Sequence, residues 1–162
     1  TDFIPKIAEM ATKKGYKIFL LGSKDGVAEE AASKLKEKFE GIQIVGVHSG
    51  YGLDDGVLEK INNSNPDILI AGMGVPMQEK WIRENKRKLA CVKLFVGGGA
   101  ILDFLSQKIR RAPLFMRKFG LEWVFRLCLE PGRLWRRYLV GNFLFFYYIL
   151  VLKLGLKTES MR

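Results

Sequence analysis

Four runs of consecutive apolar residues, each ending in or leading to glycine, constrain the fold of this chain more than any other feature. The runs predict strands over residues 16–22, 42–47, 67–71 and 92–96. They are continuous rather than alternating, which is typical of strands buried on both faces of a parallel sheet. Amphipathic segments separate them, and these predict helices over residues 6–14, 23–39, 54–63, 76–87 and after residue 99. The alternation predicts an α/β fold, a Rossmann-like parallel sheet with helices on both faces.

Charge divides the chain into two predicted domains. Residues 1–105 hold 15 Lys and Arg against 14 Asp and Glu, whereas residues 106–162 hold 12 against 3. The first segment is the α/β body, and the second is a basic, aromatic appendage. Such a concentration of positive charge favours an anionic partner, which is nucleic acid, anionic lipid or a phosphorylated substrate.

The appendage has an apolar second half. We expect helices over residues 114–129 and 133–152, interrupted at residues 130–132. Residues 138–152 carry no charge, but these 15 residues fall short of the roughly 20 that a membrane-spanning helix needs. With tyrosines and tryptophan near arginines, residues 138–156 are expected to lie at a membrane surface. The alternative is packing on the protein itself or on a second subunit, so a homo-oligomer stays open.

The loops after the predicted strands form the expected ligand site. In open parallel sheets ligands bind at the carboxyl ends of the strands, where glycines let backbone amides approach a ligand closely. Gly22, Ser23 and Gly74 lie at such positions, and Gln78 and Glu79 follow in the first turn of a predicted helix. A nucleotide or nucleotide sugar fits this edge, although tight turns alone also explain single glycines. The sequence contains neither a P-loop nor a dinucleotide fingerprint.

Metal and disulfide chemistry have few candidate residues. One histidine, His48, and two separated cysteines do not compose a usual zinc site, so no metal and no cofactor are expected. The same two cysteines suit a reducing compartment. A lone histidine such as His48 is more often structural than a general base. Asp54-Asp55 are expected to begin a helix, and the alternative is that they bind a cation together with a diphosphate.

Five segments in order along almost the whole chain resemble one protein family. They are Phe19-Leu20-Leu21-Gly22, residues 46–51, residues 62–69, residues 72–81 and the stretch from Arg110-Arg111-Ala112-Pro113 through residues 120–123 to residues 130–138. Together they resemble the WecG/TagA/CpsF glycosyltransferases. The resemblance implies an inverting, metal-independent enzyme of bacterial teichoic acid or surface polysaccharide synthesis. It would move N-acetylmannosamine or a related sugar from a UDP-sugar to undecaprenyl-diphosphate-linked N-acetylglucosamine, at the cytoplasmic face of the membrane as a peripheral protein.

The resemblance also assigns roles to residues. The family's conserved glutamine falls on Gln78, and its diphosphate-contacting arginines fall on Arg126, Arg133 and Arg136. Substrate contacts are expected from eight further residues, Gly22, Ser23, Tyr51, Gly74, Glu79, Asp103, Arg110 and Arg111. The family's general base, an aspartate, is expected before Thr1. A fragment and a homologue without catalysis are therefore both open.

Two other classes of function compete with this prediction. A non-catalytic membrane-docking domain would use the same appendage. A nucleic-acid-binding module would use the aromatic side chains among the arginines, as proteins that bind single strands do. A solvated nucleic-acid arm should not continue into the apolar residues 143–152, so we expect no nucleic-acid partner.

Overall fold

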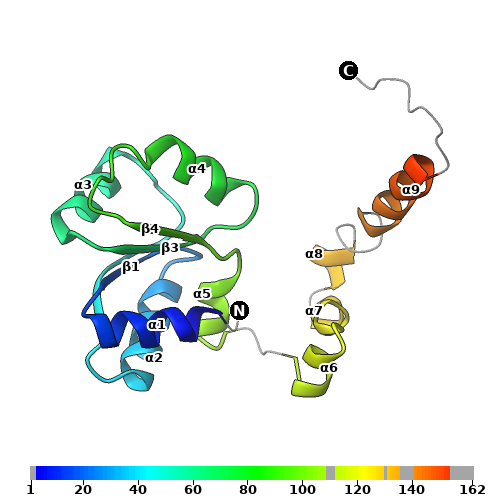
Figure 1. Cartoon of the computed structure of the whole chain (residues 1–162), viewed down its shortest axis with the longest axis horizontal. Helices are drawn as coiled ribbons and strands as arrows, with labels where there is room; N and C mark the ends of the chain where they lie inside the picture. The colour runs from blue at the N-terminus through cyan, green and yellow to red at the C-terminus, as the bar shows by residue number, and fades with distance from the viewer. Residues whose placement is uncertain (1–2, 109–111, 130, 136–140, 154–162) are drawn as a thin grey trace. The chain divides into compact units, whose positions relative to one another are not determined.

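The computed structural model describes residues 3–108, 112–129, 131–135 and 141–153 (Figure 1). They belong to two compact units, Thr1–Arg110 and Arg111–Arg162, and each unit is described by itself. The first unit is the α/β body, with α1 (Phe3–Lys14), α2 (Val27–Lys38), α3 (Asp55–Ser64), α4 (Met77–Asn85) and α5 (Ile101–Leu105) around its strands.

The sheet of this unit is parallel and has the strand order β2-β1-β3-β4. Its strands are β1 (Lys17–Gly22), β2 (Gln43–His48), β3 (Ile68–Gly72) and β4 (Leu94–Gly97). The registers of β1 with β3 and of β3 with β4 are regular, whereas the pairing of β1 with β2 shifts between Ile18 and Phe19. The predicted strands are confirmed to within two residues at each end.

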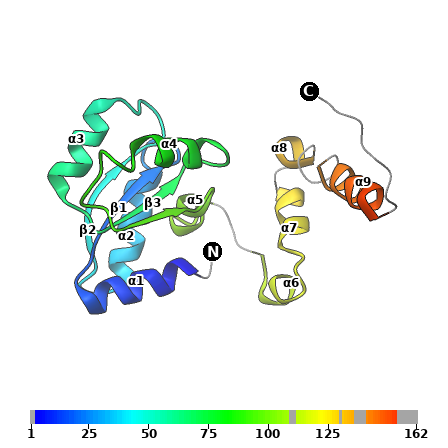
Figure 2. The same ribbon diagram turned by 45° about the horizontal axis from the view of Figure 1, so that its top comes forward.

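Helices cover both faces of the sheet, so the unit has two apolar cores (Figure 2). Alternate residues of β1 point to opposite cores, as the period of a strand requires. Ile18 and Leu20 belong to a core with α1, α2 and α5, while Phe19 and Leu21 belong to a core with α3 and α4. All four of these side chains have no measurable exposure. The layered α/β prediction is confirmed.

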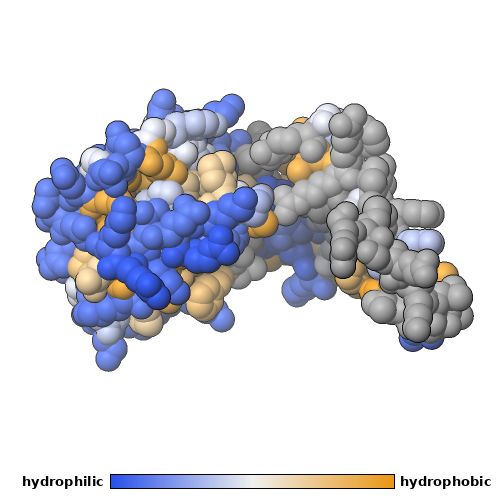
Figure 3. All heavy atoms as spheres, turned by 90° about the horizontal axis from the view of Figure 1, so that it is seen from above, coloured by the Kyte–Doolittle hydropathy of each residue, from blue (hydrophilic) through white to orange (hydrophobic). Residues whose placement is uncertain are grey.

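The surface of the first unit that is visible in Figure 3 is mostly hydrophilic. This agrees with a unit that buries the apolar residues of its strands and helices in two cores. The apolar face of α1 shows the pattern, because Ile4, Ile7, Ala8 and Ala11 recur at helical spacing and are buried.

The predicted start of one helix is wrong. The helix expected over residues 23–39 begins only at Val27, because Ser23 takes a left-handed conformation with φ 62°. Lys24 to Gly26 form a turn before the helix, closed by a hydrogen bond from the Val27 N–H to the Lys24 carbonyl of 3.1 Å. Residues 86–87 lie beyond the end of α4 in the same way.

The second unit departs further from the prediction. The helix expected over residues 114–129 is two helices, α6 (Leu114–Lys118) and α7 (Glu122–Leu129), separated at Gly120 with φ 70°. The expected end of a helix at Leu129 is confirmed, but Pro131 and Gly132, which were expected in the break, belong to the next helix, α8 (Pro131–Trp135). Proline fits the first turn of a helix, where its missing N–H has no intrahelical partner to lose.

The apolar end of the chain contains α9 (Gly141–Lys153). The helix expected over residues 133–152 is therefore described as α8 and α9, and residues 136–140 between them lie outside the described residues. No described helix is both long enough and apolar enough to cross a bilayer.

Candidate functional site

The carboxyl ends of the four parallel strands meet along one edge of the first unit. The loops on this edge follow Gly22, the last residue of β1, Gly72, the last residue of β3, and Gly97, the last residue of β4, and the loop after β2 begins at Ser49. We call these loops, with the first turns of α4 and α5, the carboxyl edge. Gly22 has φ 133°, and an added Cβ would lie 2.5 Å from the Gly72 carbonyl carbon. Only glycine allows β1 and β3 to approach so closely at this point.

Ser23 connects the loops of the carboxyl edge. Its backbone N–H donates to the Gly72 carbonyl at 2.9 Å, and its carbonyl accepts from the Gly50 N–H at 2.8 Å. Its hydroxyl donates to Asp103 Oδ1 at 2.7 Å. Ser23, the residue after β1, thus contacts Gly50 in the loop after β2, Gly72 at the end of β3 and Asp103 in α5, the helix after β4. Two predicted substrate-binding residues, Ser23 and Asp103, are brought together although they are far apart in sequence.

Gln78 is a buried part of the same edge. Its side chain is 2% exposed and lies in the first turn of α4, against Gly97. Its Oε1 accepts from the Gly99 N–H at 2.8 Å, and its Nε2 donates to Glu79 Oε1 at 2.8 Å. The carboxamide therefore holds the loop after β4 against α4, and its Nε2 has a second hydrogen left for another acceptor.

Other predicted substrate-binding residues on this edge are accessible. Tyr51 is exposed, and Glu79 is exposed beside the buried Gln78. At Gly74, with φ 85°, an added Cβ would have no atom within 4 Å, so the backbone of this loop faces open space. Val75 and Met77 beside it are exposed as well. A ligand on the carboxyl edge would meet the backbone of residues 73–75 directly.

His48 and Asp54 have local partners. His48 Nδ1 lies 2.7 Å from the Ser49 carbonyl oxygen, within hydrogen-bond distance. Asp54 is the N-cap of α3, because its side chain accepts from the Val57 N–H at 3.3 Å. The prediction that Asp54-Asp55 begin a helix is confirmed. In the part of the chain that the structure describes, no three His, Cys, Asp or Glu side chains gather as a metal site would require.

The predicted arginines belong to the second unit or to undescribed positions. Arg126 is in α7, a helix that contacts α8. Arg133 is in α8, where only its backbone is described. Arg110, Arg111 and Arg136 lie outside the described residues. Their contact with a diphosphate therefore stays a prediction.

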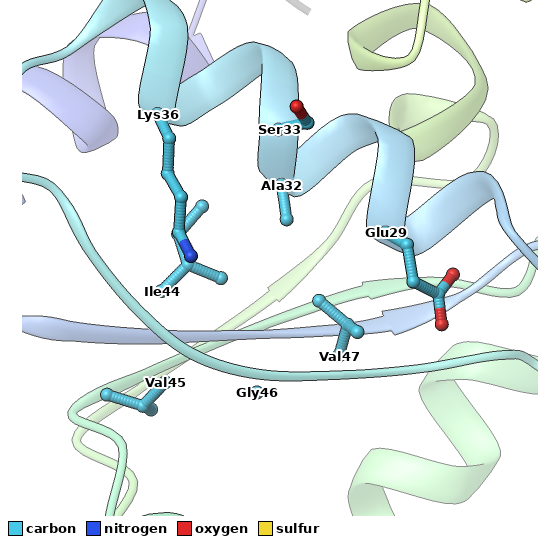
Figure 4. A pocket seen from close by; sticks show the side chains of 8 residues that line it. All are labelled: Glu29, Ala32, Ser33, Lys36, Ile44, Val45, Gly46 and Val47. Atoms are coloured by element: carbon cyan, nitrogen blue, oxygen red, sulfur yellow. The ribbon is translucent and has the colours of Figure 1, made fainter.

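A separate groove of about 360 Å³ runs between α2 and β2 (Figure 4). Apolar side chains of Ala32, Ile44 and Val47 line it, with Glu29 and Lys36 of α2 beside them. It contains none of the predicted site residues. The carboxyl edge, and not this groove, is the candidate site.

One protein-family model matches the sequence of both units, the loops of the carboxyl edge included. A model of the glycosyl transferase WecG/TagA/CpsF family matches residues 1–159. The chain belongs to this family. Membership in the WecG/TagA/CpsF family confirms the resemblance seen in the five segments and covers both structural units.

Two curated relatives in the WecG/TagA/CpsF comparison have the same name, N-acetylglucosaminyldiphosphoundecaprenol N-acetyl-beta-D-mannosaminyltransferase. The protein of Bacillus subtilis (strain 168) is 37% identical over 139 residues, and that of Bacillus spizizenii (strain ATCC 23059 / NRRL B-14472 / W23) is 36% identical over 139 residues. Each match covers 85% of this chain, but 54% and 53% of the relatives. The chain spans about half the length of these relatives.

Sequence reasoning identified the strand-end glycines and Gln78 but missed how they are connected. It did not anticipate that the Gly99 amide would bind Gln78, or that Gly50 and Gly72 would both bind the Ser23 backbone. Contacts between loops have no periodicity along the chain. The only signal was the presence of small residues at the ends of all four strands.

Proposed function

We propose that this chain is part of an inverting, metal-independent glycosyltransferase. Its carboxyl edge binds the sugar donor, and its basic residues 106–162 bind the diphosphate and the membrane surface. The enzyme moves N-acetylmannosamine, or a related sugar, from a UDP-sugar to undecaprenyl-diphosphate-linked N-acetylglucosamine in teichoic acid or surface polysaccharide synthesis. The observation that carries this proposal is the family match over residues 1–159, which includes the carboxyl edge and the arginine-rich segment. The names of the two relatives support the acceptor and the transferred sugar.

The carboxyl edge is suited to the donor. Gly74 leaves backbone beside open space, and backbone amides in such loops stabilise phosphate oxygens. Tyr51 and Glu79 are exposed at the same edge, where a phenol ring and a carboxylate fit contacts with a base or with sugar hydroxyls. Gln78 presents its remaining amide hydrogen from a buried, fixed position.

The transfer needs a cationic partner for the leaving group. In a single displacement the acceptor hydroxyl oxygen bonds to the anomeric carbon while the bond to the UDP oxygen breaks, and the hydroxyl proton passes to a general base, the role that the resemblance gives to an aspartate. Negative charge grows on the diphosphate as that bond breaks. Guanidinium groups remain charged and grip phosphate oxygens with two hydrogen bonds, so Arg126, Arg133 and Arg136 are the proposed partners, with Arg110 and Arg111 as supporting contacts.

The site of action is proposed to be the cytoplasmic membrane surface. An undecaprenyl tail stays in the bilayer, so the protein must reach its acceptor there. Residues 106–162 have the required excess of Lys and Arg for anionic lipid and continue into an apolar helix, α9. Peripheral association through residues 138–156 would place the basic segment beside the diphosphate.

Calorimetric titration with UDP-N-acetylmannosamine tests the donor. We expect saturable binding that GDP-mannose does not reproduce, because the uracil base and the acetamido group supply part of the contacts. Equal binding of both nucleotide sugars would contradict the assignment of the donor. Absence of any nucleotide-sugar binding would remove the carboxyl edge as the donor site.

A transfer assay tests the arginines. In a protein that carries the family's general base, and with a polyprenyl-diphosphate-linked N-acetylglucosamine acceptor, Arg126→Ala, Arg133→Ala and Arg136→Ala should each lower the rate of transfer about tenfold or more, since each removes a charge-assisted hydrogen bond. The matched control is Arg87→Ala, because Arg87 is exposed in the first unit and is not a predicted site residue. Unchanged transfer in all three variants would exclude the diphosphate role.

A further inference from the structure

Ser23 holds a conformation that costs free energy. With φ 62° it lies in the left-handed region, where a residue with a side chain is disfavoured by roughly 1–2 kcal/mol. Such conformations persist where surrounding contacts determine them, and they occur at functional sites. Here the surrounding contacts are the hydrogen bonds to Gly72, Gly50 and Asp103.

Asp103 is held in place by its own helix. Its neighbours Ile101 and Leu102 are buried in the core beneath α2, and α5 contacts α2 directly. The Ser106 hydroxyl donates to the Asp103 carbonyl at 3.1 Å, which fixes the end of the same short helix. The carboxylate is therefore anchored to the core, and its Oδ1 receives the Ser23 hydroxyl at 2.7 Å.

We propose that Ser23 and Asp103 are a positioning pair for the donor site. Asp103 fixes the side chain of Ser23, and Ser23 in turn fixes the loop at Gly50 and the loop that begins at Gly72. The pair acts on the donor through these two loops and not by contact with it. The proposal rests on the proposed function for the identity of the donor, but the ordering of the loops is independent of any ligand.

The geometry supports action through the backbone. The Ser23 hydroxyl hydrogen is donated to Asp103, so this hydrogen is not offered to a donor phosphate. The Ser23 N–H and carbonyl are both occupied by loop residues. Gly72, whose carbonyl Ser23 holds, is itself packed against Leu102 and the Gly99 carbonyl, and it starts the segment that leads to Gly74, where an added Cβ would meet no atom within 4 Å. Loss of the pair should therefore weaken donor binding and leave the chemical step largely unchanged.

Two substitutions at Ser23 separate positioning from direct contact. Both Ser23→Gly and Ser23→Ala remove the hydroxyl, but only glycine adopts the left-handed conformation without strain. In the full chain, we expect Ser23→Ala to raise the Kd for UDP-N-acetylmannosamine roughly tenfold and Ser23→Gly to stay within about threefold of the wild type. Equal weakening in both variants would show that the hydroxyl matters for a reason other than the left-handed backbone, such as contact with the donor, and would overturn the proposal.

Substitutions at Asp103 test whether it acts through Ser23. Asp103→Asn retains an oxygen that accepts the serine hydroxyl, so binding should remain near that of the wild type, whereas Asp103→Ala should weaken it as Ser23→Ala does. In the Ser23→Gly background, Asp103→Ala should have no more than about a twofold additional effect. The full effect of Asp103→Ala in that background would mean that Asp103 contacts the donor itself. Lys24→Ala, an exposed neighbour, is the control.

Amide hydrogen exchange provides a readout without ligand. The N–H groups of Ser23 and Gly50 should exchange about tenfold faster in Asp103→Ala than in the wild type, with protection restored in Asp103→Asn. If the wild type fails to bind UDP-N-acetylmannosamine, the proposed function falls, and the exchange rates still decide whether the pair orders the edge. If it binds but exchange and Kd are unchanged in Asp103→Ala, the pair falls and the function stands. Should Asp103→Ala not fold, the comparison of Ser23→Ala with Ser23→Gly decides.

Discussion

Asp67 connects three strands at the end of the sheet opposite the candidate site. Its Oδ2 accepts from the Lys17 N–H at 3.0 Å, and its Oδ1 accepts from Lys93 Nζ at 2.7 Å. Its backbone carbonyl accepts from the N–H groups of Lys93 and Leu94. The Lys17 amide, and after it the Lys93 ammonium, hold the pKa of Asp67 below its ordinary value. The ionised carboxylate therefore stabilises the folded chain.

We expect Asp67→Asn to lower the melting temperature at pH 7. A lowered folded-state pKa contributes stability above the unfolded pKa of about 3.9, and that contribution is lost as the pH falls through the folded value. The difference between wild type and Asp67→Asn should therefore be constant from pH 7 to about pH 5 and shrink below about pH 4. Thermal unfolding across this range measures it, with Asp25→Asn at an exposed position as the control. A difference that grows on acidification would contradict the assignment.

The backbone conformation of Ser23 could not be predicted from the sequence. Its position after an apolar run and before an amphipathic segment predicted the first residue of a helix, and it is instead left-handed. The reason is tertiary, because its partners Gly50, Gly72 and Asp103 come from distant loops. The residue was correctly selected as part of the carboxyl edge, but its conformation and its link to Asp103 have no local cause.

At the level of elements, the strands were predictable and the second unit was not. β1 and β3 are buried on both faces, as continuous apolar runs predict. The edge strands β2 and β4 are only partly buried, although their runs predicted full burial, because each pairs with a strand on one side alone. In residues 114–129 the apolar spacing suits one helix, yet Gly120 turns the chain into two. Pro131 was interpreted as a breaker, and it is the first residue of α8. A glycine can continue a helix or separate two helices, and a proline can end one helix or begin the next, so the residue type alone does not decide between these structures.

The start of α3 gives a prediction at this scale. Asp54 caps the helix through the Val57 N–H, whereas Asp55 inside the first turn makes only a 3.6 Å ion pair with Lys88 at the surface. Loss of an N-cap side chain typically costs about 1 kcal/mol, and an exposed ion pair contributes less. Asp54→Ala should therefore lower the free energy of unfolding by about 1 kcal/mol more than loss of a surface charge does, and Asp55→Ala is the matched comparison. Urea unfolding of both variants decides, and equal losses would contradict the cap.

The whole molecule combines a nearly neutral α/β unit with a basic second unit. The helix α9 carries large exposed apolar side chains, at Phe145, Tyr147, Tyr148, Ile149 and Leu150. Amphipathic aromatic side chains together with Lys and Arg favour the interface of an anionic bilayer. The division of charge along the sequence predicted this contrast, whereas the number of helices in the second unit depends on turns.

Removal of residues 140–162 should release the protein from membranes. We expect the full chain to sediment with vesicles that contain phosphatidylglycerol and the shortened chain to stay in the supernatant. Circular dichroism should show that the first unit remains folded in both. Binding to pure phosphatidylcholine vesicles should be weaker for the full chain, because the basic residues lose their anionic partner. Equal sedimentation of both chains would place the membrane contact elsewhere.

The contacts of Ser23 also bear on when the carboxyl edge is completed as the chain is synthesised. Residues 23 and 103 are 80 positions apart, and the hydrogen bond between them closes a loop of the chain that contains β2, β3 and β4. Parallel sheets close such distant contacts slowly, since loop entropy is lost before the contact is gained. During synthesis the carboxyl edge therefore cannot exist until Asp103 has left the ribosome. Nascent chains that stop earlier expose apolar strands and present no edge for a sugar nucleotide.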